Sequence, residues 1–149
     1  MEDKLKEQES YKLIEPVSSE AIGHWIKDYP LYEKIIGYSS LGHVFLFSPS
    51  QSDYVVYYPF QAAAKSYGTF DSASEFEKEI LQDEDFSEYV LRPDHVQEII
   101  KAVGTLSEDE VYIPQPYPFL GGDESIDSYD KGNIWVMLDL VSQLLADNA

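Results

Sequence analysis

Hydrophobic positions along the first part of the chain recur at helical spacing. Apolar residues repeat between positions 21 and 29, after Ser18 and before Pro30. A serine that can cap the first turn, followed by this spacing, predicts a helix, and the proline ends it. Residues 1–17 are richer in charge, so we interpret them as a polar N-terminal segment that precedes one domain at 18–149.

Continuous apolar runs in the middle of the chain predict β-strands. The runs cover residues 42–47 and 54–60, and the turn-forming segment 48–53 between them favours a hairpin. Weaker strand candidates flank this pair at residues 32–38 and 61–70. Because both central runs carry apolar side chains on both faces, we expect them to be covered on two sides or to lie in the middle of a sheet.

Helical spacing returns in the second half of the chain. Ser72 and Glu75 form a capping box at the start of an apolar pattern that reaches residue 81. A further pattern runs from Pro93, which suits a first helical turn, to Gly104, which suits a helix end. The spacing also predicts a terminal helix over residues 134–145.

Proline and glycine divide the region before the terminal helix. Residues 111–119 contain three prolines, which restricts them to an edge strand or an extended loop. Gly121 and Gly122 turn the chain, and the acidic stretch 123–131 is typical of a loop. The order helix, strands, helices, strand, helix predicts a single α+β domain, with an antiparallel sheet packed against N-terminal, middle and C-terminal helices.

Acidic side chains dominate the charged positions. The 149 residues include 28 Asp and Glu against 10 Lys and Arg, for a formal net charge of −18, and Lys131 is the one base after Thr105. Such a surface repels nucleic acid and anionic membranes, and it attracts a cationic partner. Solubility alone also explains an acidic composition, because net charge speaks to association and not to fold.

The sequence carries none of the spacings that common catalytic and metal sites require. The absence of cysteine excludes disulfides and thiolate sites, and no serine stands in a G-x-S-x-G elbow. His24, His43 and His95 are isolated from one another, and no glycine-rich phosphate loop is present. Carboxylates brought together only by the fold stay possible as a hydrolase site. We expect no catalytic residue, no cofactor and no metal.

The start of the chain and its hydropathy favour the cytoplasm. No apolar run approaches the roughly 20 residues needed to cross a bilayer. Residues 1–5 are charged and lack the apolar stretch of a signal peptide. We therefore expect a cytoplasmic protein with no membrane partner and no direct contact with nucleic acid.

The C-terminal third resembles a known family. Val103-Gly-Thr-Leu106 is followed by Glu108-Asp-Glu-Val-Tyr112, then by Pro118-Phe-Leu-Gly-Gly122, and finally by an apolar helix that ends in Leu140-Val-Ser-Gln-Leu-Leu-Ala146. This order resembles the immunity-protein domain that is paired with type VI secretion DNase effectors and that follows a GAD-like domain in longer relatives. Leu41–Leu46 is similar to the central strand of that family.

The resemblance implies an immunity protein that neutralises a cognate antibacterial toxin by stoichiometric binding. The toxin would be a secreted nuclease, and the basic groove with which a nuclease holds DNA would suit an acidic inhibitor. On this hypothesis, the partner-binding side chains are acids and aromatics of the C-terminal third: Glu108, Asp109, Glu110, Tyr117, Phe119, Asp123, Glu124, Asp127 and Asp130.

Other functions fit the same sequence. An enzyme such as a hydrolase that reverses the toxin's modification would protect the cell at far below a one-to-one ratio. A different immunity superfamily of similar size would have the same role on another sheet. An acidic DNA mimic would bind housekeeping DNA-binding proteins with no toxin present.

Overall fold

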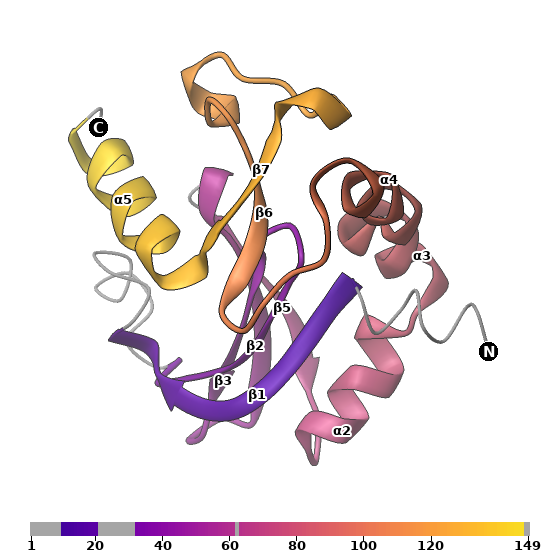
Figure 1. Ribbon diagram of the computed structural model, residues 1–149. Coiled ribbons are helices and arrows are strands. Elements are labelled where there is room, and N and C mark those ends of the chain that lie inside the picture. Colours follow the sequence, from indigo (N-terminus) through magenta and orange to yellow (C-terminus); the bar gives the residue numbers. More distant parts are fainter. Residues whose placement is uncertain (1–9, 21–31, 62, 148–149) are drawn as a thin grey trace.

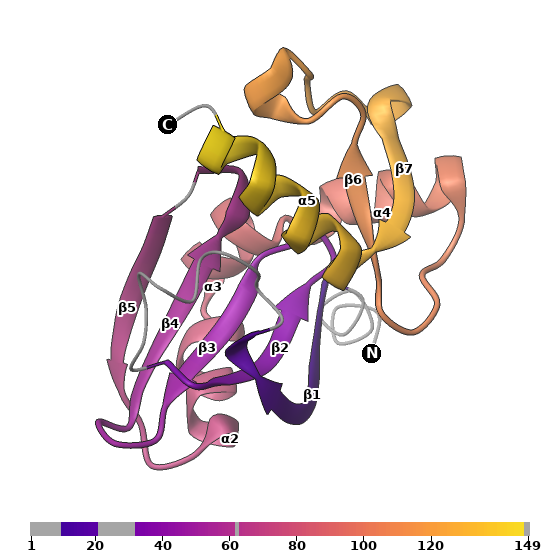
Figure 2. The ribbon, with the colours of Figure 1, turned by 90° about the vertical axis from the view of Figure 1, so that its left-hand side faces the viewer.

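A five-stranded antiparallel sheet forms the centre of the molecule (Figures 1 and 2). The computed structural model describes residues 10–20, 32–61 and 63–147. The strands follow one another in chain order across the sheet, and each is antiparallel to the next. They are β1 (Tyr11–Ser18), β2 (Lys34–Ser39), β3 (Val44–Ser48), β4 (Asp53–Tyr58) and β5 (Ala63–Thr69).

Short helices follow the sheet, and a second hairpin and a long helix complete the chain. The helical part begins with the one-turn η2 (Pro59–Gln61) and continues after β5 with α2 (Ala73–Phe76), π-helical η3 (Glu77–Leu81), α3 (Glu84–Phe86), π-helical η4 (Ser87–Leu91) and α4 (Pro93–Val103). The C-terminal part contains β6 (Glu110–Pro114), η5 (Pro118–Leu120), η6 (Ile126–Ser128), β7 (Tyr129–Asn133) and α5 (Ile134–Asp147). The mixed α+β fold predicted from the sequence is confirmed.

The central hairpin buries side chains on both of its faces, as its continuous apolar runs predict. Val44 and Leu46 of β3 point into a core shared with β6 and α5, whereas Phe45 points into a second core shared with α2, η3, α3 and η4. The ladder pairs Phe45 with Val56, so β4 alternates in the same way. Side chains at these positions are almost fully buried, and each contributes roughly 1.5–3 kcal/mol to stability.

A third, smaller core attaches α4 to the β6–β7 hairpin. Val96 and Ile99, on the apolar face of α4, pack against Tyr112 and Tyr129 of the hairpin. Leu41, from the turn between β2 and β3, reaches the same cluster. The turn after β2 therefore meets α4 and the hairpin at one place.

Most of the predicted elements are present. The hairpin of residues 42–60, the strands beside it, and the helices at 72–81, 93–103 and 134–145 are confirmed, and residues 111–119 begin as strand β6. The helix predicted after Ser18 lies outside the described residues, as does His24. Strand β1 (11–18) overlaps the stretch 1–17 interpreted as a polar segment, and its pairing with β2 makes this part of the chain the first strand of the sheet.

Two elements differ from the sequence prediction. Residues 129–131, expected to end the acidic loop 123–131, instead form β7 together with Gly132 and Asn133. The apolar partner strand β6 supplies the ladder, which the sequence Tyr-Asp-Lys-Gly-Asn does not signal by alternation. Residues 84–91 form a helical stretch that begins where the Asp83 carboxylate accepts hydrogen bonds from the backbone N–H groups of Asp85 and Phe86.

Candidate partner-binding site

The acids predicted from the sequence lie at opposite ends of the β6–β7 hairpin. The ladder pairs Glu110 with Asn133 and Pro114 with Tyr129, so Glu108–Glu110 precedes one end and the loop 115–128 joins the other. Four steps of about 3.4 Å along an antiparallel strand separate the two ends by roughly 14 Å. The predicted acids therefore form two separate groups.

The group at Glu108–Glu110 shapes the start of β6. The Glu110 carboxylate accepts the backbone N–H of Ser107 at 2.7 Å. Asp109 adopts a positive φ of 65°, and its carbonyl accepts the N–H of Ile134, the first residue of α5, at 2.8 Å. Glu108 is exposed. Asp109 and Glu110 thus stabilise the local backbone, whatever contact they make with a partner.

The second acidic group is exposed and partly held in place by serines. One Asp123 carboxylate oxygen accepts hydrogen bonds from the hydroxyls of Ser125 and Ser128, both at 2.7 Å, and from the Ser125 N–H at 3.0 Å. These donors lower the pKa of Asp123 to about 2, so its charge persists well into acid. Asp127 and Asp130 are also exposed. This loop presents fixed negative charge to solvent.

Tyr117 and Phe119 are half-buried and stack on one another. Their ring centroids lie 5.6 Å apart, and Phe60 approaches them at 5.6 Å and 6.3 Å respectively. The three rings pack against the core that α5 and β6 share with the sheet. Their main role in the free protein is to attach the loop after β6 to the end of β4.

The Gly121-Gly122 pair is required by the path of this loop. Gly121 adopts a positive φ of 94°, which favours glycine. A Cβ on Gly122 would lie 1.8 Å from the carbonyl oxygen of Pro116, because the chain folds back on itself there. The most distinctive motif of the sequence therefore has a steric cause.

A cavity of about 510 Å³ opens beside this loop. Three separate parts of the chain line it: the turn after β2, the end of β4 with η2, and η4 with its junction to α4, while the β6–β7 loop closes the fourth side. We call it the aromatic cavity, and its lining includes Leu41, His43, Tyr58, Phe60, Tyr89, Arg92, Pro118, Phe119, Glu124 and Tyr129.

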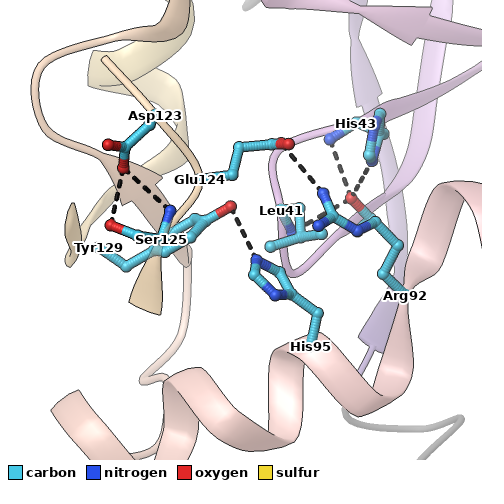
Figure 3. A network of polar contacts seen from close by, with 9 residues as sticks. Leu41, His43, Arg92, His95, Asp123, Glu124, Ser125 and Tyr129 are labelled. Atoms are coloured by element: carbon cyan, nitrogen blue, oxygen red, sulfur yellow. Dashed lines mark hydrogen bonds and ion pairs between the residues drawn. The ribbon is translucent and has the colours of Figure 1, made fainter. Parts of the chain in front are cut away.

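Arg92, the one arginine of the chain, is placed at the corner between η4 and α4. Its N–H bonds to the Ser87 carbonyl at 2.7 Å and closes the π-turn, while its own carbonyl accepts the N–H of Val96 in α4. Pro93 disfavours the right-handed helical region for Arg92. Arg92 ends η4 in the left-handed region, with a φ of 52°. Its guanidinium then bonds to the Glu124 carboxylate at 3.0 Å (Figure 3).

His43 borders the cavity as a neutral side chain. Its Nδ1 lies 2.7 Å from the Ser39 hydroxyl oxygen, which already accepts the N–H groups of Leu41 and His43. The serine hydrogen is therefore directed at Nδ1, and Nε2 carries the ring proton. Desolvation, helped by the nearby charge of Arg92, lowers the pKa of His43 to about 4. The ring also meets Tyr58 edge-on at 5.1 Å.

His95 and Tyr129 form a second neutral pair at the cavity (Figure 3). His95 Nε2 and the Tyr129 hydroxyl lie 3.2 Å apart. Burial lowers the pKa of His95, and burial together with Glu124 raises the pKa of Tyr129 to about 12. At neutral pH the cavity is thus lined by one uncharged histidine, His43, and by one arginine that is already paired, while the uncharged His95 lies behind Tyr129 of the lining.

The sequence prediction missed most of the residues that line this cavity. Phe119 and Glu124 were predicted, whereas His43, Tyr89 and Arg92 were not. The single Arg-Pro step of the chain was the available signal for Arg92, since the residue before a proline often ends a helix.

A second cavity of about 270 Å³ lies at the other end of the hairpin. Glu108 and Glu110 line it, together with Tyr11, Tyr38 and Tyr112 from the adjacent strands. The two predicted acidic groups therefore border different cavities.

The described part of the chain offers no metal centre and no membrane span. No three of its His, Asp and Glu residues gather in a way that could hold a metal ion. None of its helices combines the length and the apolar character needed to cross a membrane.

An acidic loop thus lies beside a cavity in this α+β domain, and a comparison with known families shows where the chain belongs. Residues 71–145 match the model of the family described as "T6SS immunity protein Tdi1, C-terminal". The match covers half of the chain, and the protein therefore belongs to this family of type VI secretion immunity proteins. It includes η4, α4, the hairpin and α5, and thus the walls of the cavity that carry Tyr89, Arg92 and Glu124.

A solved structure shares the fold. The crystal structure of Atu4351 from Agrobacterium tumefaciens superposes with a TM-score of 0.67 over 91% of this chain and 67% of that one, at 14% sequence identity. At this identity the likeness concerns the fold alone. No curated protein matches the chain.

Proposed function

We propose that this protein neutralises a cognate type VI effector by forming a stoichiometric complex with it, and that the effector is a nuclease. Membership of the immunity family is the observation that carries the proposal. The cell that makes the effector needs an antagonist, and a binding partner that occupies the toxin is the simplest form of one. Because a nuclease would act on DNA, we place this encounter in the cytoplasm.

The charge of the chain supports a basic partner. A formal net charge of −18 produces a negative field that speeds association with a cationic surface and disfavours nucleic acid. Nucleases that hold DNA present cationic grooves to its phosphates. An acidic protein that covers such a groove would exclude the substrate and keep the toxin inactive.

Among the described residues, a serine that contacts a histidine is found in the Ser39–His43 pair, which is the geometric candidate for the hydrolase alternative. Ser39 is fully buried, and its oxygen accepts two backbone N–H groups while its hydrogen is directed at His43. A nucleophilic serine needs an exposed oxygen that can approach a substrate. The pair therefore stabilises the turn after β2, and we favour binding over catalysis.

Titration separates the two functions. The product of the neighbouring effector gene is purified and mixed with increasing amounts of the protein, and residual cleavage of plasmid DNA is measured. We expect full inhibition near one molecule per toxin and a complex of that ratio in size-exclusion chromatography. Inhibition at far lower ratios, growing with incubation time, would show an enzyme, and intact toxin activity at excess protein would refute the immunity pairing.

A further inference from the structure

The rim of the aromatic cavity carries an unusual exposed side chain. Among the large hydrophobic residues that are exposed in the described ranges, Tyr89 is the most exposed, at 74%, and the others are aliphatic. An exposed tyrosine next to a recess is the kind of residue that anchors protein interfaces, because it buries a large rigid area at low entropic cost. The packing of the free protein gives no reason for this side chain to face solvent.

The electrostatics of the cavity favour a positively charged occupant. His43, the one histidine of its lining, is neutral, as is His95, which bonds to Tyr129 of the lining, and Arg92 is compensated by Glu124. The ion pair uses Oε1 of Glu124, and no hydrogen bond from another described residue reaches Oε2. With a 55% exposed side chain, this carboxylate can accept a second cation. The field of the whole acidic chain acts in the same direction.

The lining also suits a long basic side chain. The rings of Tyr58, Tyr89 and Phe119 belong to the lining, and a lysine or arginine gains a cation–π contact where it comes over a ring within about 6 Å of its centre. A volume of about 510 Å³ falls within the roughly 300–1,000 Å³ of typical ligand pockets, enough for a side chain and part of its backbone. Because the Arg92–Glu124 pair joins the two walls, the site is formed before the partner arrives.

We propose that the aromatic cavity receives a projecting lysine or arginine side chain of the toxin, with Tyr89 as the anchor on the rim and Glu124 as the carboxylate that pairs with the incoming cation. This inference rests on the proposed function, since the occupant belongs to the toxin. It moves the centre of the interface from the exposed acids of the loop to a recess that the sequence did not reveal.

Substitutions at Tyr89 test the site without disturbing the ion pair. The dissociation constant for the toxin, carrying a substitution that abolishes cleavage, is measured by calorimetry at low and moderate salt. We expect Tyr89→Ala to bind about tenfold more weakly than the wild type. Tyr89→Lys should bind more weakly still, and Tyr89→Glu should bind better than Tyr89→Lys, because only the lysine repels a cationic occupant.

Leu140 provides the matched controls. It is 45% exposed on α5 and outside the lining of the cavity. Leu140→Ala removes exposed apolar area as Tyr89→Ala does, and Leu140→Lys adds the same charge as Tyr89→Lys. We expect both variants to bind the toxin within about twofold of the wild type. Thermal unfolding checks that every variant is folded.

Two results would overturn the proposal while leaving the immunity function intact. One is equal affinity for Tyr89→Ala and Leu140→Ala. The other is tighter binding by Tyr89→Lys than by Tyr89→Glu, which would show that an anionic group enters the cavity. If the wild-type protein forms no complex with the toxin, the proposed function fails, and the assignment of the cavity to the toxin fails with it.

Discussion

Replacing Gly122 with alanine tests whether the Gly-Gly motif is steric in origin. The added Cβ would lie 1.8 Å from the Pro116 carbonyl oxygen and 2.7 Å from its carbon, so the backbone of the loop must move by more than an ångström. Both atoms belong to the main chain, so no side-chain rotation relieves the overlap. Overpacking of this kind costs about 3 kcal/mol. For a chain of this length we expect the melting temperature to fall by roughly 6–12 °C.

Alanine substitutions at Gly121 and Gly68 are controls that distinguish steric overlap from backbone strain. Both adopt a positive φ, of 94° and 106°, and a Cβ on either would meet no atom within 4 Å. Gly121→Ala and Gly68→Ala should therefore cost only the strain of the left-handed region, about 1 kcal/mol. Unfolding is followed by circular dichroism in heat and in urea. A Gly122→Ala protein as stable as Gly121→Ala would refute the steric explanation of the motif.

Three further predictions follow from the polar contacts. Folding lowers the pKa of His43 from 6.5 to about 4, so the unfolded chain binds more protons between these values and the free energy of unfolding should fall as the pH is lowered through this window. Between pH 7 and pH 4.5 the wild type should lose up to about 2–3 kcal/mol more stability than His43→Asn, as measured by urea unfolding. Ser39→Ala leaves two buried N–H groups without their acceptor and should cost about 2 kcal/mol in the same assay, and a cost below 0.5 kcal/mol would contradict that role. A triple variant with lysine in place of Asp123, Glu124 and Asp127 should bind the toxin more weakly and with a smaller salt dependence. An unchanged dissociation constant in a folded variant would exclude this loop from the interface.

The sheet and the longer helices were predictable because their signals are local. The continuous apolar runs at 42–47 and 54–60 predict strands that are buried on both faces. Pro93 and Gly104 mark the ends of α4 in the sequence itself. Strand β7 gives no such signal, since only its first residue is buried and its pairing depends on β6, which lies about twenty residues earlier. A strand whose stability comes from its partner leaves little trace in its own residues.

The candidate site was less predictable than the fold, because it is assembled from residues far apart in the chain. The sequence located the acids, but it gave no sign that the hairpin holds Glu108 and Asp123 at opposite ends. Nothing in the sequence near Tyr89 distinguishes it from the buried tyrosines of the sheet. Its exposure follows from where η4 ends against the corner at Arg92, which is a property of the packed molecule.

The Arg92–Glu124 pair shows how a surface ion pair can fix the geometry of a cavity while adding little to stability. Exposed pairs contribute at most about 1 kcal/mol, and this one is partly open to solvent on both sides. Its consequence is positional, since it joins the corner before α4 to the loop that Gly121 and Gly122 allow to fold back. Both partners lie within the region matched by the immunity family. One wall of the cavity thus depends on three connected features: the two glycines that shape the loop, the Arg-Pro corner, and Glu124, which bonds to that corner. A toxin that enters the cavity would contact this wall as a whole.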